Sequence, residues 1–257
     1  MNFLIRSLTS FLYVGLLLGS LYIDATFFTA MLFLMAIIAQ CELQKITKKK
    51  IVLSYLFFPL AYVAFQLIPE YYPHLVGVAV VGCLGMLSFF SNSKQLRYSK
   101  AAVYYLGLFQ ICIPLLLIAQ LGKSNPIYVL YFFGIIWLSD TGAYVIGSLF
   151  GKRKLAPSIS PNKTIEGSLG GVLVATAALL YAVDIENFQY SWVLILVVTA
   201  ISGALGDLVQ SKIKRVCGVK DSGNILPGHG GIYDRIDSSI LAAPIYILLL
   251  NLFAYVS

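Results

Sequence analysis

Long apolar runs restrict the fold of this 257-residue sequence more than any other feature. A helix that crosses a hydrocarbon core needs about 20 apolar residues, and most of the runs approach that length. Transmembrane β-strands would alternate apolar and polar residues over roughly 10 positions, and the sequence does not do so. We therefore predict an all-α polytopic membrane protein. It has about nine transmembrane helices, at residues 7–23, 26–43, 51–68, 75–90, 101–121, 127–150, 169–183, 192–213 and 238–256.

The composition agrees with this class. Charged residues make up 11% of the chain and hydrophobic residues 59%, whereas a soluble domain has about 25% charged and about 45–50% apolar residues. No stretch has the composition of a separate soluble domain, and no internal repeat is evident. We expect a single integral membrane domain over residues 1–257.

The basic residues indicate the orientation. If nine spans alternate in direction, seventeen of the eighteen Lys and Arg residues fall on one side, and only Lys123 falls on the other. Basic loops stay in the cytoplasm, so the N-terminus is predicted inside and the C-terminus outside. Orientation and attraction to anionic lipid headgroups account for the net charge of +7. The bilayer is thus the expected partner, and no nucleic acid is needed.

Seven carboxylates lie on the predicted cytoplasmic side or within spans. Charges there are costly and point to function. Asp140 falls inside a predicted span. It could either tie two helices together or belong to a functional site. The seven are Glu42, Asp140, Glu166, Asp207, Asp221, Asp234 and Asp237, and all but Glu42 lie in the second half.

One helix face in the eighth span carries three polar groups. Asp207, Ser211 and Lys214 are spaced i, i+4 and i+7, which places carboxylate, hydroxyl and ammonium together. Such a face suits a phosphate and metal site. The alternative is that Asp207 only pairs with a lysine to tie two helices together.

The stretch "PGHGG" that follows is typical of a backbone anion cradle. Gly228, Gly230 and Gly231 let backbone N–H groups approach a polyphosphate without interference from side chains. His229 is a candidate donor to a phosphate oxygen, or else a residue that satisfies local backbone groups.

Two carboxylates come directly after the glycines. Asp234 and Asp237 are one turn apart where the last helix should begin, so both can face one ligand. Carboxylates beside phosphates need a hard cation between them, and Mg²⁺ is the usual one. Arg235 is expected to contact a phosphate or to pair with Asp221.

A second polar segment, "SPNKTIEG", predicts a helix start. Ser160 would be the N-cap and Pro161 the first helical residue. Such an end binds anions, and Lys163 and Glu166 would share its face. The alternative is a capped helix with a surface ion pair.

Residues 211–237, "SKIKRVCGVKDSGNILPGHGGIYDRID", resemble the signature of the phosphatidate cytidylyltransferases, or CDP-diglyceride synthases. That signature runs S-x-apolar-K-R, four variable residues, K-D, then P-x-H-G-G-apolar-x-D-R-apolar-D, and this sequence shows no departure from it. Residues 139–168 are similar to the family's other polar segment. The first half matches only as apolar spans.

The resemblance implies a reaction and its cofactors. Such enzymes condense CTP with phosphatidic acid to CDP-diacylglycerol and pyrophosphate, with Mg²⁺ and, in reported cases, a second cation such as K⁺. Asp207 and Asp234 are the first choice of metal ligands, with Asp237 and Asp221 second. The expected catalytic groups are Asp207, Asp234, Lys214 and His229. The expected phosphate-binding groups are Lys163, Ser211, Arg215, Lys220, Gly230, Gly231 and Arg235.

The resemblance also implies an organisation. Helices one to five (about 7–121) would be a scaffold half, and helices six to nine (about 127–257) the catalytic half. Family members form homodimers, although no residue here indicates one. A bacterial-type inner membrane, with the site facing the cytoplasm, is expected.

Two other functions remain as alternatives. A CTP-using polyprenol kinase would be attacked at the γ-phosphorus and would release CDP. A transporter would use Asp140 and Asp207 to carry ions across the midplane, but it would distribute polar residues towards both faces. The polar residues gather towards one face instead.

Overall fold

The computed structural model describes residues 3–68, 72–91, 99–182, 190–226, 228 and 230–253. The described chain is almost wholly helical, with one short antiparallel hairpin of β1 (Lys154–Ala156) and β2 (Ser160–Thr164). Short 3-10 helices are labelled η1 and η6, and η4 is a π-helix. The helices are α1 (Phe3–Ile23), α2 (Ala25–Thr47), η1 (Val52–Leu56), α3 (Phe57–Leu67), α4 (Tyr72–Ser91), α5 (Lys100–Leu106), η4 (Gly107–Cys112), α6 (Ile113–Ser124), α7 (Pro126–Phe150), α8 (Ile165–Ala182), α9 (Tyr190–Val216), η6 (Tyr233–Arg235) and α10 (Ser239–Phe253).

Five helical segments in the described chain are long and apolar enough to cross a membrane. They are α2, the continuous segment Lys100–Ser124, α7, α8 and α9. Four shorter apolar helices accompany them, at Phe11–Ile23, Val52–Leu67, Tyr72–Met86 and Ser239–Phe253. These segments follow the predicted runs in order, which supports the all-α membrane class. The number of crossings stays a prediction.

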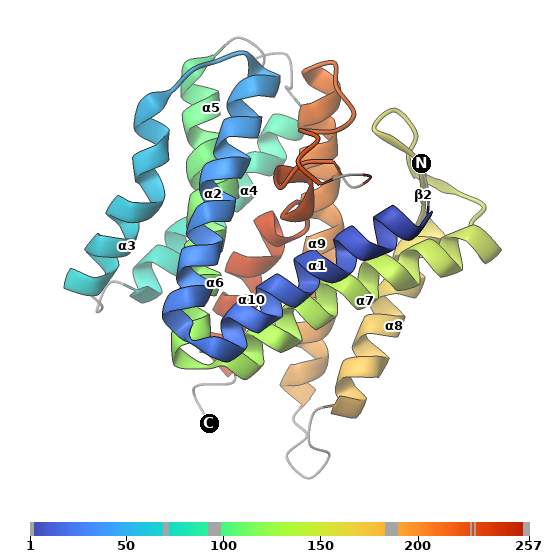
Figure 1. The fold of residues 1–257 in the computed structure, drawn as a ribbon. Coiled ribbons are helices and arrows are strands. Elements are labelled where there is room, and N and C mark those ends of the chain that lie inside the picture. The colour runs from blue at the N-terminus through green and yellow to red at the C-terminus, as the bar shows by residue number, and fades with distance from the viewer. Residues whose placement is uncertain are drawn as a thin grey trace.

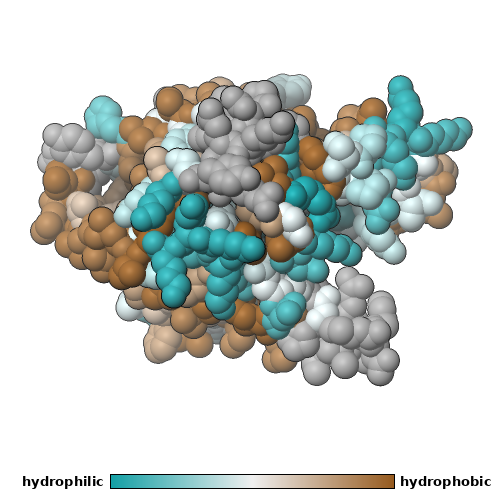
Figure 2. Space-filling model, turned by 90° about the horizontal axis from the view of Figure 1, so that it is seen from above, coloured by the Kyte–Doolittle hydropathy of each residue, from teal (hydrophilic) through white to brown (hydrophobic). Residues whose placement is uncertain are grey.

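The chain passes back and forth between the two ends of one bundle (Figure 1). The start of α1, the β-hairpin and the loop between α9 and η6 lie at the same end, and α10 runs from there towards the opposite end. Figure 2 views the molecule from above, onto this end. Hydrophilic side chains gather over the middle and at one corner of this face, with hydrophobic side chains around them. The polar segments of the sequence therefore meet at one end of the bundle.

Helices α7 and α8 pack closely through glycines. A methyl group on Gly171 would lie 2.3 Å from the carbonyl oxygen of Ser139, and one on Gly167 would lie 2.7 Å from that of Ala143. Small residues of this kind let membrane helices approach to backbone contact. The pair thus forms a firm base for the hairpin that connects the two helices.

The predicted helix start at Ser160 is wrong. Residues 160–164 form β2, and α8 begins at Ile165. The hydroxyl of Thr164 accepts a 3.1 Å hydrogen bond from the N–H of Gly167, as an N-cap does. Ser160 pairs with β1 instead. A Ser-Pro pair is compatible with a helix N-cap and with the end of a strand. Here the pairing of β2 with β1 favours the strand.

Lys163 and Glu166 consequently do not share a helix face. Glu166, in the first turn of α8, accepts hydrogen bonds of 3.0 Å from the backbone N–H groups of Lys152 and Arg153 and from Nε of Arg153. Glu166 anchors the two residues that precede β1, while Lys163 extends from β2 towards α9.

Candidate active site

Helix α9 carries the polar face that its spacing predicts. The hydroxyl of Ser211 donates to Oδ1 of Asp207 over 3.1 Å, one turn away on the same helix. Lys214, one turn further on, donates to Oδ1 of Asp234 over 2.6 Å. One face of α9 therefore contacts both of the aspartates that the sequence singled out.

The β-hairpin brings a second lysine to this face. Lys163 of β2 forms a short ion pair with Asp207, and both side chains are partly exposed. At the end of α9, Nε of Arg215 donates to the carbonyl oxygen of Ile159 over 3.2 Å. These contacts link the two polar segments, which are far apart in the sequence, at one place.

Asp234 is buried, and both of its carboxylate oxygens accept hydrogen bonds. Besides Lys214, it accepts bonds at Oδ2 from N–H of Ser222 (2.8 Å), Oγ of Ser222 (2.9 Å) and N–H of Gly231 (3.0 Å). Burial opposes its charge, but the hydrogen bonds from Lys214, Gly231 and Ser222 outweigh this effect and hold the pKa of Asp234 below its usual value. The carboxylate is thus charged and has little capacity left for a metal ion.

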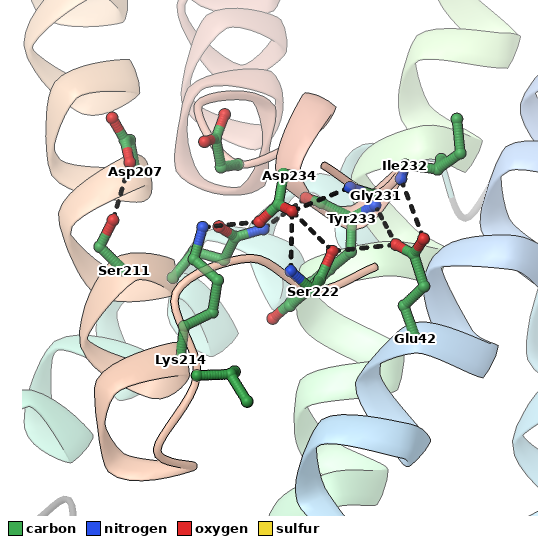
Figure 3. A network of polar contacts seen from close by, with 12 residues as sticks. Glu42, Asp207, Ser211, Lys214, Ser222, Gly231, Ile232, Tyr233 and Asp234 are labelled. Atoms are coloured by element: carbon green, nitrogen blue, oxygen red, sulfur yellow. Dashed lines mark hydrogen bonds and ion pairs between the residues drawn. The ribbon is translucent and has the colours of Figure 1, made fainter. Parts of the chain in front are cut away.

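Glu42 of α2 reaches the same loop from the side opposite Lys214 (Figure 3). It is only 1% exposed. Its carboxylate accepts hydrogen bonds from N–H of Ile232 (3.2 Å), N–H of Tyr233 (2.8 Å) and Oγ of Ser222 (3.0 Å). The sequence marked Glu42 as a costly carboxylate without placing it at the site. One signal in the sequence could have indicated this role: Glu42 is the only acidic residue within a predicted apolar run of the first half.

Part of the glycine-rich loop, which is expected to cradle a phosphate, contacts carboxylates in this structure. The N–H groups of Gly231, Ile232 and Tyr233 donate to the carboxylates of Asp234 and Glu42. A methyl group on Gly231 would lie 2.3 Å from Oε2 of Glu42, so a larger residue there would displace this carboxylate. In this structure the loop folds around the protein's own carboxylates.

Two cavities meet at Asp140. One of about 420 Å³ lies between α7, β2, α8 and α9 and is lined by Asp140, Lys163 and Asp207, among others. The other, of about 530 Å³, lies between α1, α7 and the loop and is lined by Asp140, Arg235 and Asp237, among others. This placement favours a site role for Asp140 over a simple tie between helices.

Asp237 lies against α9 next to Asp207. A methyl group on Gly206 would be 2.8 Å from the carbonyl oxygen of Asp237, so the backbone of α9 and the backbone before α10 are in contact there. Burial, and after it the negative charges of Asp207 and Asp140, raise the pKa of Asp237 to about 8. If all three were ionised, these carboxylates would repel one another, and a cation near them would relieve the repulsion.

The carboxylates are not gathered as a finished metal site. Among the described residues, no group of three or more His, Cys, Asp or Glu side chains is placed to hold an ion. Carboxylate oxygens are nevertheless the donors that Mg²⁺ takes, and Mg²⁺ is usually bound through one or two carboxylates plus substrate phosphates. The donor set therefore fits a hard cation that arrives with a phosphate.

The other predicted residues that the structure describes lie in the loop between α9 and η6 or in η6. Asp221, Lys220 and Arg235 are exposed. Gly230 has φ of +81°, and a methyl group there would lie 2.6 Å from Oδ2 of Asp234, so the position requires glycine. His229 lies outside the described residues.

The fold is that of an all-α membrane protein with its polar segments at one end, and comparison with known proteins identifies it as a nucleotidyltransferase and gives the family. The cytidylyltransferase family matches residues 4–253, so the chain belongs to it, as the resemblance predicts. Members of this family generally use a divalent metal ion.

Three relatives illustrate the similarity. The chain is similar to the phosphatidate cytidylyltransferase of Staphylococcus haemolyticus (strain JCSC1435), with 35% identity over 255 residues that cover 96% of this chain and 98% of the relative. Those of Staphylococcus aureus (strain COL) and Staphylococcus epidermidis (strain ATCC 12228 / FDA PCI 1200) are 42% and 43% identical over 162 residues, 62% of each chain.

Proposed function

We propose that this protein transfers the cytidylyl group of CTP to phosphatidic acid, giving CDP-diacylglycerol and pyrophosphate. The observation that carries the proposal is the pair of cavities that meet at Asp140, at the polar end of an apolar bundle. A transfer between a charged nucleotide and a membrane lipid needs two binding spaces that share one reacting centre. Relatives named for this reaction support the choice of substrates.

The chemistry is an in-line displacement. A phosphate oxygen of phosphatidic acid attacks the α-phosphorus of CTP, the bond from that phosphorus to the bridging oxygen breaks, and pyrophosphate leaves with that oxygen. The attacking phosphate is anionic at neutral pH, so no strong general base is required. Catalysis then rests on positioning and on charge neutralisation.

The cations of the site suit this role. Lys163 lines one cavity and Arg235 the other, so each space holds one basic side chain for a phosphate. Arg215 and Lys220 are exposed at the same end, and His229 is a further proposed donor. Lys214 is held by Asp234, and we propose that it orders the loop rather than leaving its partner.

The bonding of Asp234 changes the proposed metal ligands. Lys214 contacts Oδ1 of its carboxylate, and three donors contact Oδ2, one of them the Ser222 hydroxyl that is shared with Glu42. We therefore propose that Asp207 and Asp237 hold Mg²⁺, with Asp140 nearby, and that Asp234 and the exposed Asp221 are secondary. When bound, Mg²⁺ neutralises phosphate charge. A second cation such as K⁺ stays an expectation from the resemblance.

The proposed topology has nine spans, with the N-terminus and the site on the cytoplasmic side of a bacterial-type inner membrane and the C-terminus outside. The gathering of polar segments at one end supports it (Figure 2). Helices one to five would serve as a scaffold half and helices six to nine as the catalytic half. A homodimer is proposed from the family alone.

One assay tests the function. Purified full-length protein is incubated with CTP labelled at the α-phosphorus, phosphatidic acid and Mg²⁺, after which lipid and released phosphate species are measured. We expect labelled lipid and pyrophosphate in equal amounts. A kinase would release labelled CDP and leave the lipid unlabelled, and a transporter would release neither product. Substantial activity of Asp207→Asn would refute its metal assignment.

A further inference from the structure

We propose that Glu42, in the half expected to be only scaffold, is a positioning residue for the transfer. Its buried carboxylate fixes the backbone of residues 232–233 and, through it, the placement of Asp234 and Asp237. The catalytic meaning of this inference rests on the proposed function. The inference that Glu42 holds the loop in place depends only on the contacts of Glu42.

The environment of Glu42 is unusual for a charged group inside an apolar helix. Among the described residues, no Lys or Arg forms an ion pair with it. Its described hydrogen-bond donors come from the loop that precedes α10, two of them backbone N–H groups. A buried charge costs several kcal/mol unless hydrogen bonds satisfy it. The loop must therefore close around Glu42 for the charge to be tolerated.

Tyr233 extends this contact to two further helices. It is 0% exposed. Its N–H donates to Glu42 over 2.8 Å, its carbonyl oxygen accepts from Nε2 of Gln210 on α9, and its hydroxyl donates to Oε1 of Gln110 on η4. Every polar atom of Tyr233 is thus held by a different helix. Gln110 belongs to η4, which has π-helix geometry. Such geometry is rare in proteins, and where it occurs it is frequently at a functional site.

Ser222 connects Glu42 directly with Asp234. Its hydroxyl lies 3.0 Å from Oε2 of Glu42 and 2.9 Å from Oδ2 of Asp234. Because a hydroxyl carries one proton, it donates to one of these carboxylates at a time, so the two groups share it. Glu42 lines neither cavity. It therefore acts through the loop and not on a substrate.

The test compares Glu42→Gln with Gln44→Met. Gln44 lies on the same helix and is 7% exposed, but its hydrogen bonds go to Ile51 and Ser54 within the first half. Both variants remove buried polar contacts of α2. Only the first changes the contact with the loop.

We expect Glu42→Gln to lower kcat about 10–100-fold, as loss of supporting groups around a site does. The KM for CTP should change less than about threefold, because no cavity-lining group is altered. Gln44→Met should keep kcat within about twofold of the parent protein. Equal losses of kcat in both variants, or an unchanged kcat in Glu42→Gln, would overturn the proposal.

Amide hydrogen exchange supplies a readout that does not depend on activity. The N–H groups of Ile232 and Tyr233 should exchange faster in Glu42→Gln and not in Gln44→Met. If Glu42→Gln does not fold, Glu42→Asp takes its place, with the same two readouts and the same overturning results. If the parent protein fails to make the lipid product, the proposed function fails. The exchange result still decides whether Glu42 fixes the loop.

Discussion

Lys214 of α9 donates a 2.6 Å hydrogen bond to Asp234, and both side chains are buried, at 8% and 6% exposure. The pair joins the end of a membrane helix to the turn that carries the polar loop. Because both side chains are buried, water cannot solvate either charge in place of its partner. Removing one side chain therefore leaves the charge of the other uncompensated.

Replacing Lys214 by Met should therefore destabilise the protein by about 3–5 kcal/mol, the usual cost of breaking a buried pair from one side. Unfolding in detergent measures it. Lys45→Met, at an exposed position of α2, is the control and should change stability by no more than about 0.5 kcal/mol. Equal stability of the two variants would contradict the burial argument. The double variant Lys214→Met/Asp234→Asn should lose less stability than the sum of the losses in Lys214→Met and Asp234→Asn, because the two residues contact each other.

Gly231→Ala should abolish most of the activity. The added methyl group would lie 2.3 Å from Oε2 of Glu42 and from Oγ of Ser222, so the loop must open to accept it. Gly77→Ala is the matched control, because a methyl group on that α4 residue meets nothing within 4 Å. Product formation and thermal unfolding of both variants check this. An active, stable Gly231→Ala protein would show that the loop does not need its close approach to Glu42.

Glu166→Ala should loosen the β-hairpin without unfolding the bundle. Three donors from Lys152 and Arg153 lose their acceptor, so the amides of these residues should exchange with solvent about tenfold faster or more. Arg153→Gln keeps both backbone bonds and should have a smaller effect. Activity should fall as well, because the hairpin carries Lys163. Unchanged exchange in Glu166→Ala would mean that other contacts hold the hairpin.

In the absence of divalent cations, stability should fall as the pH rises from about 4 towards about 8. The folded protein raises the pKa of Asp237 from 3.8 to about 8 through burial and neighbouring carboxylates. The folded state thus binds this proton more tightly than the unfolded state, and the free energy of unfolding declines across that interval. Thermal unfolding with EDTA at several pH values measures the slope. Asp237→Asn should flatten it, and Mg²⁺ should restore stability at the upper end.

Local pattern in the sequence predicted the elements whose cause is local. The apolar runs indicated the order of the helices, and the spacing of Asp207, Ser211 and Lys214 placed them on one face of α9, where the structure has them. The glycine-rich stretch also indicated a tight loop beside carboxylates. Periodicity and residue type suffice for such statements, because neighbours within a few residues determine them.

What the sequence missed depends on distant contacts. Glu42 and Tyr233 are 191 residues apart, and no local pattern indicates that one binds the other. The start of α8 was misplaced because β2 pairs with a strand whose position spacing alone does not specify. The order of preference between Asp234 and Asp237 likewise depends on donors, such as Lys214, that the fold brings to one of them.

The glycine contacts between α7 and α8 bear on how a two-tailed lipid approaches the centre of the protein. With Gly167 and Gly171 lying against the backbone of α7, that seam leaves no passage for a hydrocarbon chain. The acyl tails of a substrate must remain in the bilayer along another flank of α7, so only the phosphate end reaches Asp140.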